Sequence, residues 1–74
     1  MQTERIKITT EYIKLDQLLK FAGMADNGAM AMEMILDGIV LFNGEVCTMR
    51  GKKVRPKDVV TIDFEDEEYQ IEVE

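Results

Sequence analysis

Apolar residues in the first half of the chain recur three and four positions apart, which is the spacing of one face of an α-helix. The first such stretch runs from Leu15 to Ala22, and Gly23 can end it. In the second, Asn27 is a suitable N-cap for a helix that continues to Leu36 and is followed by an Asp-Gly pair. The pattern therefore predicts two short helices.

The remaining apolar residues alternate with polar ones, which is the period of a half-buried strand. A short first strand is expected within residues 5–9, and two further strands within residues 60–64 and 69–73. Asn43-Gly44 separates two apolar stretches and is a strong β-hairpin signal, because both residues tolerate positive φ. The predicted fold is α+β, with two short helices packed on a small antiparallel sheet that residues 40–73 form.

The chain of 74 residues is short enough to form one domain with a small hydrophobic core. We expect Leu18, Ile35 and Ile62 in that core, between the helices and the sheet. The composition, 46% hydrophobic and 32% charged, is typical of a folded protein. The longest apolar run is far shorter than the ~20 residues of a membrane span, and the chain starts without the pattern of a signal peptide. These features predict a single cytoplasmic domain, residues 1–74, that does not contact a membrane.

Residue types that enzymes and metalloproteins use are scarce. The chain has no histidine, one cysteine, and no glycine-rich nucleotide-binding motif. The acidic run at residues 63–69 lacks the spacing and the glycine of a calcium-binding loop. We therefore expect no catalysis, no cofactor, no metal site and no small-molecule substrate.

Charge is distributed unevenly along the chain. The net charge is −6, yet five of the nine positive residues lie between Arg50 and Lys57. Nucleic-acid affinity comes mainly from neutralised phosphates, so an acidic protein that binds RNA must concentrate its cations away from its carboxylates. The candidate phosphate contacts are Arg50, Lys52, Lys53 and Arg55, which are expected in an exposed turn after the hairpin. A solvated turn without a binding role is the alternative for this cluster.

The start of the second helix is another candidate phosphate site. The amides of Gly28, Ala29 and Met30 have no acceptor within the helix and carry partial positive charge, an arrangement that accepts phosphates. Gly28 would also allow a phosphate to approach the backbone closely. Asn27 can act here either as a phosphate ligand or as a plain N-cap.

The order of these features resembles the RNA-binding domain of ribosomal small-subunit protein S-four, also called the alpha-L motif. The resemblance is strongest over residues 13–63, and the chain looks most like the short stand-alone bacterial members, the YaaA-like proteins. The matching residues are Lys14-Leu15-Asp16 at the first helix, Ala31 and Ile35 in the second, Gly38, Val40, Phe42 and Asn43-Gly44 around the hairpin, and then Val54, Pro56 and Asp58.

The resemblance implies a non-enzymatic RNA-binding module in which both helices and the hairpin loop form one surface. The partner that it implies is structured or ribosomal RNA. Recognition would depend on phosphates and on shape rather than on base sequence. The residues implied on this surface are Lys14, Lys20, Asn27, Gly28, Arg50, Lys52, Lys53 and Arg55.

Two positions depart from the pattern of this family and open an alternative. Many members carry Ser-Arg where this chain has Asn27-Gly28, and often a second basic residue where it has Met32. The second helix is apolar nearly all round, and exposed Met-rich surfaces often bind proteins. The alternative is therefore a protein–protein interaction module that uses Met32 and Leu36, both of which would then be exposed.

The aromatic residues follow the apolar patterns of the predicted helices and strands. They are therefore expected in the core or in the sheet, and not at the surface as platforms for stacked bases. These residues are Tyr12, Phe21, Phe42, Phe64 and Tyr69.

Overall fold

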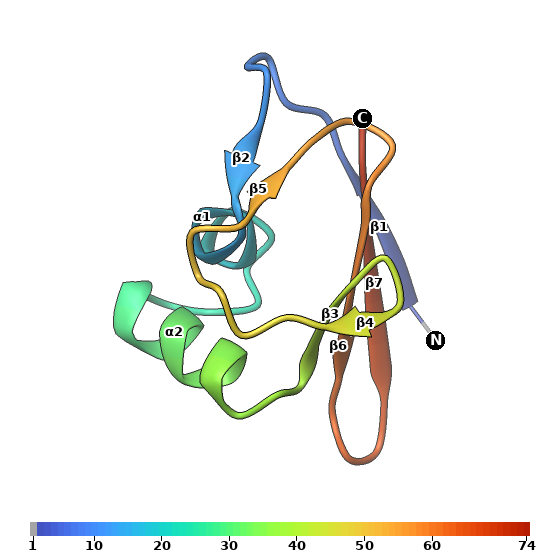
Figure 1. The fold of residues 1–74 in the computed structure, drawn as a ribbon. Coiled ribbons are helices and arrows are strands. Elements are labelled where there is room, and N and C mark those ends of the chain that lie inside the picture. The colour runs from blue at the N-terminus through green and yellow to red at the C-terminus, as the bar shows by residue number, and fades with distance from the viewer. Residues whose placement is uncertain (1) are drawn as a thin grey trace.

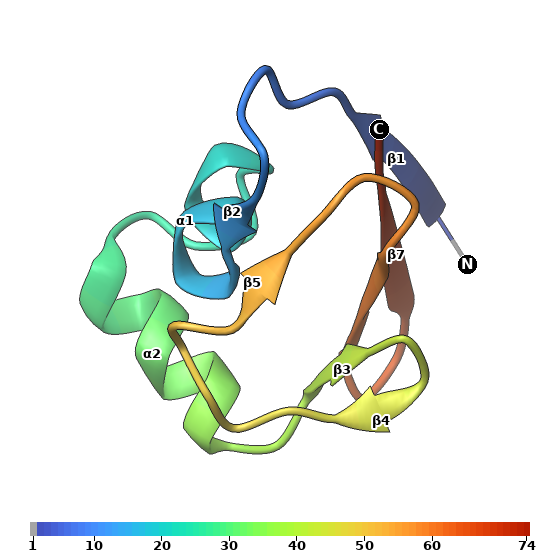
Figure 2. The same cartoon turned by 45° about the horizontal axis from the view of Figure 1, so that its top comes forward.

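The computed structural model describes residues 2–74, which form two short helices, a five-stranded sheet and a two-stranded ribbon (Figure 1). The helices and the ribbon lie on one side of the larger sheet in both views (Figures 1 and 2). In chain order the elements are β1 (Gln2–Ile6), β2 (Ile13–Lys14), α1 (Leu15–Phe21), α2 (Gly28–Leu36), β3 (Val40–Phe42), β4 (Glu45–Val46), β5 (Lys53–Val54), β6 (Val59–Asp63) and β7 (Glu68–Val73).

The five-stranded sheet has the strand order β1-β7-β6-β3-β4, and β2 pairs with β5 in the separate ribbon. The pairs β7–β6, β6–β3 and β3–β4 are antiparallel, as predicted for the second half of the chain. However, β1 pairs in parallel with β7. The α+β class is confirmed, whereas the prediction of a small antiparallel sheet is corrected to a larger, mixed one.

The first strand lies earlier in the chain than predicted. It ends at Ile6, which is opposite Val73 at the end of β7, so residues 7–9 have no partner strand to continue along. One further backbone hydrogen bond, from the Ile8 amide to the Glu74 carbonyl (3.0 Å), marks the end of the pairing. The expected strand at residues 5–9 was therefore wrong in its bounds.

Both helices form where the apolar spacing predicts them. The Asn27 side chain caps α2 by accepting a hydrogen bond from the Met30 amide (2.8 Å), and Gly38 follows the helix with φ 79°. The hairpin turn is also confirmed, since Asn43 (φ 49°) and Gly44 (φ 90°) join β3 to β4 with two positive-φ residues.

The core lies between the five-stranded sheet and the helices. Leu18, Ile35 and Ile62 are fully buried in it, as predicted. No helix in residues 2–74 is long and apolar enough to cross a membrane. The other fully buried side chains are Leu15, Leu19, Ala31, Val40, Val54, Val60 and Ile71.

Candidate nucleic-acid interface

The basic segment, which we define as residues 50–58, is anchored to the first turn of α1 by its own backbone. The Leu15 amide donates to the Lys52 carbonyl (2.9 Å), and the Asp16 amide donates to the Arg50 carbonyl (3.1 Å). Amides in the first turn of a helix have no acceptor within the helix, so the basic segment satisfies two of them here. Residues far apart in the chain are thereby fixed in one surface.

The β2–β5 ribbon places Lys14 directly opposite Lys53. Opposite residues of an antiparallel pair present their side chains on the same face, and like charges in this arrangement repel each other. Val54 after Lys53 is fully buried, and Arg55, which follows β5, is exposed. Two cations thus share one face of a short ribbon, and a third lies directly after it.

Two lysines of the segment lie over aromatic rings on different sides of the chain. Lys53 Nζ is 4.9 Å from the centroid of the Tyr12 ring, and Lys52 Nζ is 4.8 Å from the centroid of the Phe42 ring. Lys52 is half-buried, and Lys53 belongs to a strand. The expectation of an exposed turn was therefore wrong for Lys52, which is half-buried against Phe42. Lys53 is exposed as expected, but it belongs to β5, which pairs with β2.

Arg50 reaches across to α2. Its Nη1 atom lies 3.2 Å from the sulfur of Met32. The Met32 side chain is half-buried, so the prediction that it is exposed was wrong. The contact places a guanidinium against the face of α2 on which the family resemblance implies a basic side chain. We define the basic surface as Lys14, Arg50, Lys52, Lys53 and Arg55.

Asp58 is the single carboxylate within the basic segment, and it holds the backbone in shape. Its Oδ2 accepts the Arg55 amide (2.8 Å), and its Oδ1 accepts the Asn43 side-chain amide (3.1 Å). Asn43 Oδ1 in turn accepts the Val59 amide (2.8 Å). These bonds tie the hairpin turn to the end of the basic segment.

Lys57 belongs to the basic segment but extends elsewhere. Its φ of 82° after Pro56, with the hydrogen bond from the Asp58 amide to the Arg55 carbonyl (3.0 Å), is typical of a type II turn. Lys57 borders a hollow together with Glu72 and Glu74, at the end of β7. Lys57 therefore lies near the carboxylates of Glu72 and Glu74, which are not part of the basic surface.

The start of α2 offers fewer amides than expected. Of the amides that open α2, that of Met30 donates to Asn27 Oδ1, whereas those of Gly28 and Ala29 have no acceptor in the part of the chain that the structure describes. Lys20 lies in the last turn of α1 and is half-buried. Asn27 is exposed, and its side-chain oxygen already acts as the N-cap.

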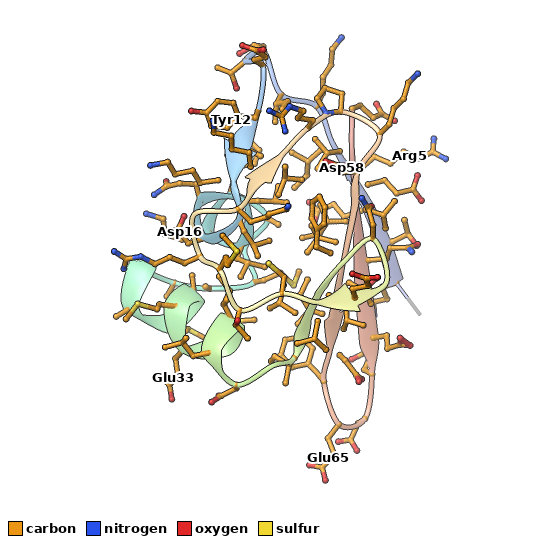
Figure 3. All side chains as sticks on the ribbon, in the orientation of Figure 1. Arg5, Tyr12, Asp16, Glu33, Asp58 and Glu65 are labelled. Carbon is orange, nitrogen blue, oxygen red and sulfur yellow. The ribbon has the colours of Figure 1, made fainter. Side chains whose placement is uncertain are left out.

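Among the described residues, no cation of the basic surface forms an ion pair with a carboxylate. In the part of the chain that the structure describes, ion pairs within 4.0 Å join only Arg5 to Glu72 (3.6 Å) and to Glu74 (4.0 Å). Figure 3 shows Arg5 on the β1 side of the molecule, away from Tyr12 and Asp16. Positive charge at the basic surface is therefore available to an anionic partner.

The carboxylates gather at the opposite end, where the β6–β7 hairpin turns. Figure 3 shows Glu65 at this end, which we call the acidic tip: Asp63, Glu65, Asp66, Glu67 and Glu68. The negative charge of Glu67 raises the pKa of the Tyr69 phenol above its ordinary value of 10.0, and burial and the hydrogen bond to Glu67 act in the same direction. No group of three or more His, Cys, Asp or Glu side chains within residues 2–74 is arranged to hold a metal ion.

Several apolar side chains are exposed on the α2–β4 side. Leu36 is 61% exposed, as predicted, and Val46 (59%) and Met49 (64%) were not anticipated. The Val46 side chain lies beside Gly38, two residues beyond Leu36. We call Leu36, Val46 and Met49 the apolar patch.

One of the five aromatic residues is exposed, although all five were expected in the core or in the sheet. Phe21 is 70% exposed, because it ends α1 beyond the last turn that faces the core, while Tyr12, Phe42, Phe64 and Tyr69 are half-buried. Sequence reasoning also missed that Tyr12 and Phe42 support lysines. The alternation of Tyr12 with Lys14 could have placed those two side chains on one face of a strand.

Comparison with known proteins gives two matches. A model of the S4 domain matches residues 6–72, a range that includes both helices and the whole basic surface. The chain is also 41% identical over 58 residues to the Bacillus subtilis (strain 168) protein named Probable ribosome maturation protein RlbA. That match covers 78% of this chain and 82% of the relative.

Proposed function

Because the chain belongs to the S4 domain family, we propose that it binds structured RNA through phosphate contacts made by the basic surface and by the amides that open α2. The module acts without catalysis. The similar Bacillus subtilis protein carries the name Probable ribosome maturation protein RlbA, which supports ribosomal RNA as the target and a cytoplasmic site of action. S4 domains are RNA-binding domains, which supports the broader role.

The observation that carries the proposal is the pairing of Lys14 with Lys53. Two like charges directly opposite each other destabilise a strand pair, and here no carboxylate within 4.0 Å offsets the repulsion. Both lysines are exposed, and a negatively charged group placed between them would relieve this repulsion. A phosphate of an RNA backbone supplies that charge.

The geometry favours recognition of the backbone over recognition of bases. The cations extend from a ribbon and a loop, and contacts to phosphate position a protein on RNA without reading its sequence. Tyr12 and Phe42 lie beneath lysines, which orders these side chains before binding and lowers the entropy lost when they contact phosphate. Specificity would then come from the shape of the RNA.

A matched pair of variants tests the proposal. Lys53→Gln removes a cation from the basic surface, whereas Lys57→Gln removes one from the same segment on the side of Glu72 and Glu74. RNA affinity is measured at several salt concentrations on a structured ribosomal RNA fragment. We expect Lys53→Gln to lower the logarithmic salt slope by about 0.7 to 0.9 units and Lys57→Gln to leave it unchanged. Equal effects of the two variants would contradict the proposal.

A second candidate function is protein binding through the apolar patch. It is favoured by the exposure of Leu36, Val46 and Met49, each of which is more than half exposed. Met32 contributes little to such a contact because Arg50 covers its sulfur. The salt dependence separates the two functions, since apolar contacts do not weaken as salt rises.

A further inference from the structure

Phe21 lies at the rim of a surface hollow that the proposed phosphate contacts do not use. The hollow has a volume of about 290 Å³ and is lined by Lys7, Ile8, Thr9, Thr10, Ile13 and Phe21. This size is at the lower end of ligand sites, too small for a large ligand but sufficient for one planar ring system. With 70% of its surface exposed, Phe21 presents a ring for stacking.

The chemistry of the rim favours a nucleotide over an apolar protein side chain. Lys7 is the one charged residue in the lining and can contact a phosphate. The Thr9 hydroxyl can donate or accept a hydrogen bond, and the Thr10 hydroxyl, which donates to the Tyr12 carbonyl (2.9 Å), can still accept one. No carboxylate takes part in the lining, although the protein carries 15 acidic residues. An anionic ligand with a flat ring therefore fits this hollow.

The hollow also adjoins the basic surface. Ile13, which lines it, precedes Lys14 in β2, and Phe21 follows Lys20 in the last turn of α1. A helix rises 1.5 Å per residue, so the length of α1 separates Lys14 from Phe21 by only about 10 Å. One RNA strand can therefore extend from the phosphate contacts to the hollow.

We infer that this hollow holds one unpaired nucleotide of the bound RNA, with its base stacked on Phe21 and its phosphate near Lys7. The inference rests on the proposed function and adds to it a preference for RNA that has a bulge or loop beside its paired region. Unpaired bases are the parts of RNA that can leave the helix and stack on aromatic side chains.

The test compares two synthetic RNA hairpins that share one stem, of which one carries a single bulged adenosine. The wild-type protein should bind the bulged hairpin more tightly, by roughly 5- to 150-fold, the range measured for one stacked base. Phe21→Ala should remove this preference without changing the salt slope, because no phosphate contact is lost. Phe21→Leu should also remove it, since leucine keeps the apolar volume but has no aromatic ring. Leu36→Ala, at an equally exposed apolar position, should keep the preference.

The outcomes separate this inference from the proposed function. Equal binding of both hairpins by the wild type, or a preference that Phe21→Leu retains, would overturn the stacking site while RNA binding itself stands. If the wild type binds neither hairpin, the proposed function fails and the inference fails with it. Circular dichroism confirms that the variants are folded, and Phe21→Leu provides the conservative change if Phe21→Ala is not.

Discussion

The basic surface and the acidic tip are both charged and both exposed, but the structure holds them differently. The basic surface draws residues from β2, β5 and the loop before β5, and hydrogen bonds fix it to α1 and to the hairpin turn. The acidic tip is a local turn closed by two backbone bonds between Phe64 and Glu67 (2.9 and 3.2 Å). Its contacts with other parts of the chain include the hydrogen bond from the Gln2 side chain to Glu67 (2.9 Å) and that from the Asp63 amide to the Ile39 carbonyl (2.8 Å).

This difference indicates which of the two charged regions is arranged to bind a partner molecule. At the acidic tip, Asp63 and Glu68 lie opposite each other at the ends of β6 and β7, and all five carboxylates are exposed to water, which weakens their repulsion. At the basic surface, Lys14 and Lys53 are likewise exposed and opposite each other, but the segment that carries Lys53 is also bonded to the first turn of α1 and lies against Tyr12. A cluster of like charges that several elements hold in place is suited to binding an oppositely charged partner, whereas exposed carboxylates at the end of one hairpin are typical of a solvated surface.

Neutralising the basic surface should have the largest effect on RNA binding. A variant with Lys14, Arg50, Lys53 and Arg55 all changed to Gln removes up to four phosphate contacts. The logarithmic salt slope should fall by roughly three units, at about 0.7 to 0.9 per contact. The measurement is a binding titration on a structured ribosomal RNA fragment at several salt concentrations.

The control for this variant neutralises the acidic tip. Glu65→Gln, Asp66→Asn and Glu68→Gln together make the protein less negative without touching the basic surface. RNA affinity and its salt slope should change little, because exposed charges further apart than about 10 Å are screened at 0.1 M salt. If neutralising the tip changed the slope as much as neutralising the basic surface, overall charge and not a local site would control binding.

Removing Asp58 should lower the stability of the fold more than removing a carboxylate of the acidic tip. Asp58→Ala deprives the Arg55 amide and the Asn43 side chain of their acceptor, at an expected cost of about 1 to 3 kcal/mol. Asp66→Ala should cost under about 0.5 kcal/mol, as for most surface substitutions. Urea unfolding of both variants measures the difference, and similar midpoints would show that the Asp58 bonds do not hold the segment.

The two adjacent lysines should differ in their effect on stability. Lys52 is half-buried over Phe42, so Lys52→Glu replaces an attractive contact with a carboxylate facing the ring. Lys53→Glu also loses a ring contact, with Tyr12, but its side chain is exposed and Lys14 opposite it would attract the new carboxylate. The free energy of unfolding should therefore fall by about 1 kcal/mol more for Lys52→Glu than for Lys53→Glu. Thermal unfolding of the two variants checks this, and a greater loss for Lys53→Glu would contradict the assigned burial.

The smallest predicted effect lies at the acidic tip. Glu67→Gln removes the negative charge beside Tyr69, so the pKa of that phenol should fall towards its ordinary value of 10.0. Since the folded-state pKa is raised, the favourable contribution of the protonated phenol is complete below the unfolded pKa and is lost as pH rises through the folded one. Phenolate absorbance in a Tyr12→Phe background measures the shift, and an unchanged midpoint would rule out Glu67 as its cause.

The sequence predicted those elements whose signals are local. Apolar spacing located α1 and α2, and the Asn43-Gly44 pair located the hairpin, because neighbours in the chain determine these structures. The parallel pairing of β1 with β7 joins the two ends of the chain and has no local signal, so both the mixed sheet and the bounds of β1 were missed.

The candidate site was predicted in composition but not in arrangement. The cluster between Arg50 and Arg55 was recognised from charge, and the resemblance implied Lys14 beside it. The pairing of β5 with β2, which the sequence does not show, places Lys53 opposite Lys14. The side chains of Lys52 and Lys53 lie over different rings, those of Phe42 and Tyr12. Phe21 was expected in the core or in the sheet from its place in the apolar pattern, although its position at the end of α1 leaves it exposed.

Mapping the RNA contact residue by residue tests the central claim most directly. A structured ribosomal RNA fragment is titrated into isotope-labelled protein, and the backbone amide resonances are followed by NMR. The account predicts the largest shifts at Lys14, at residues 50–55 and at Gly28 and Ala29, with resonances of the acidic tip unchanged. Shifts confined to the apolar patch, or centred on residues 63–68, would contradict the basic surface as the site of RNA binding.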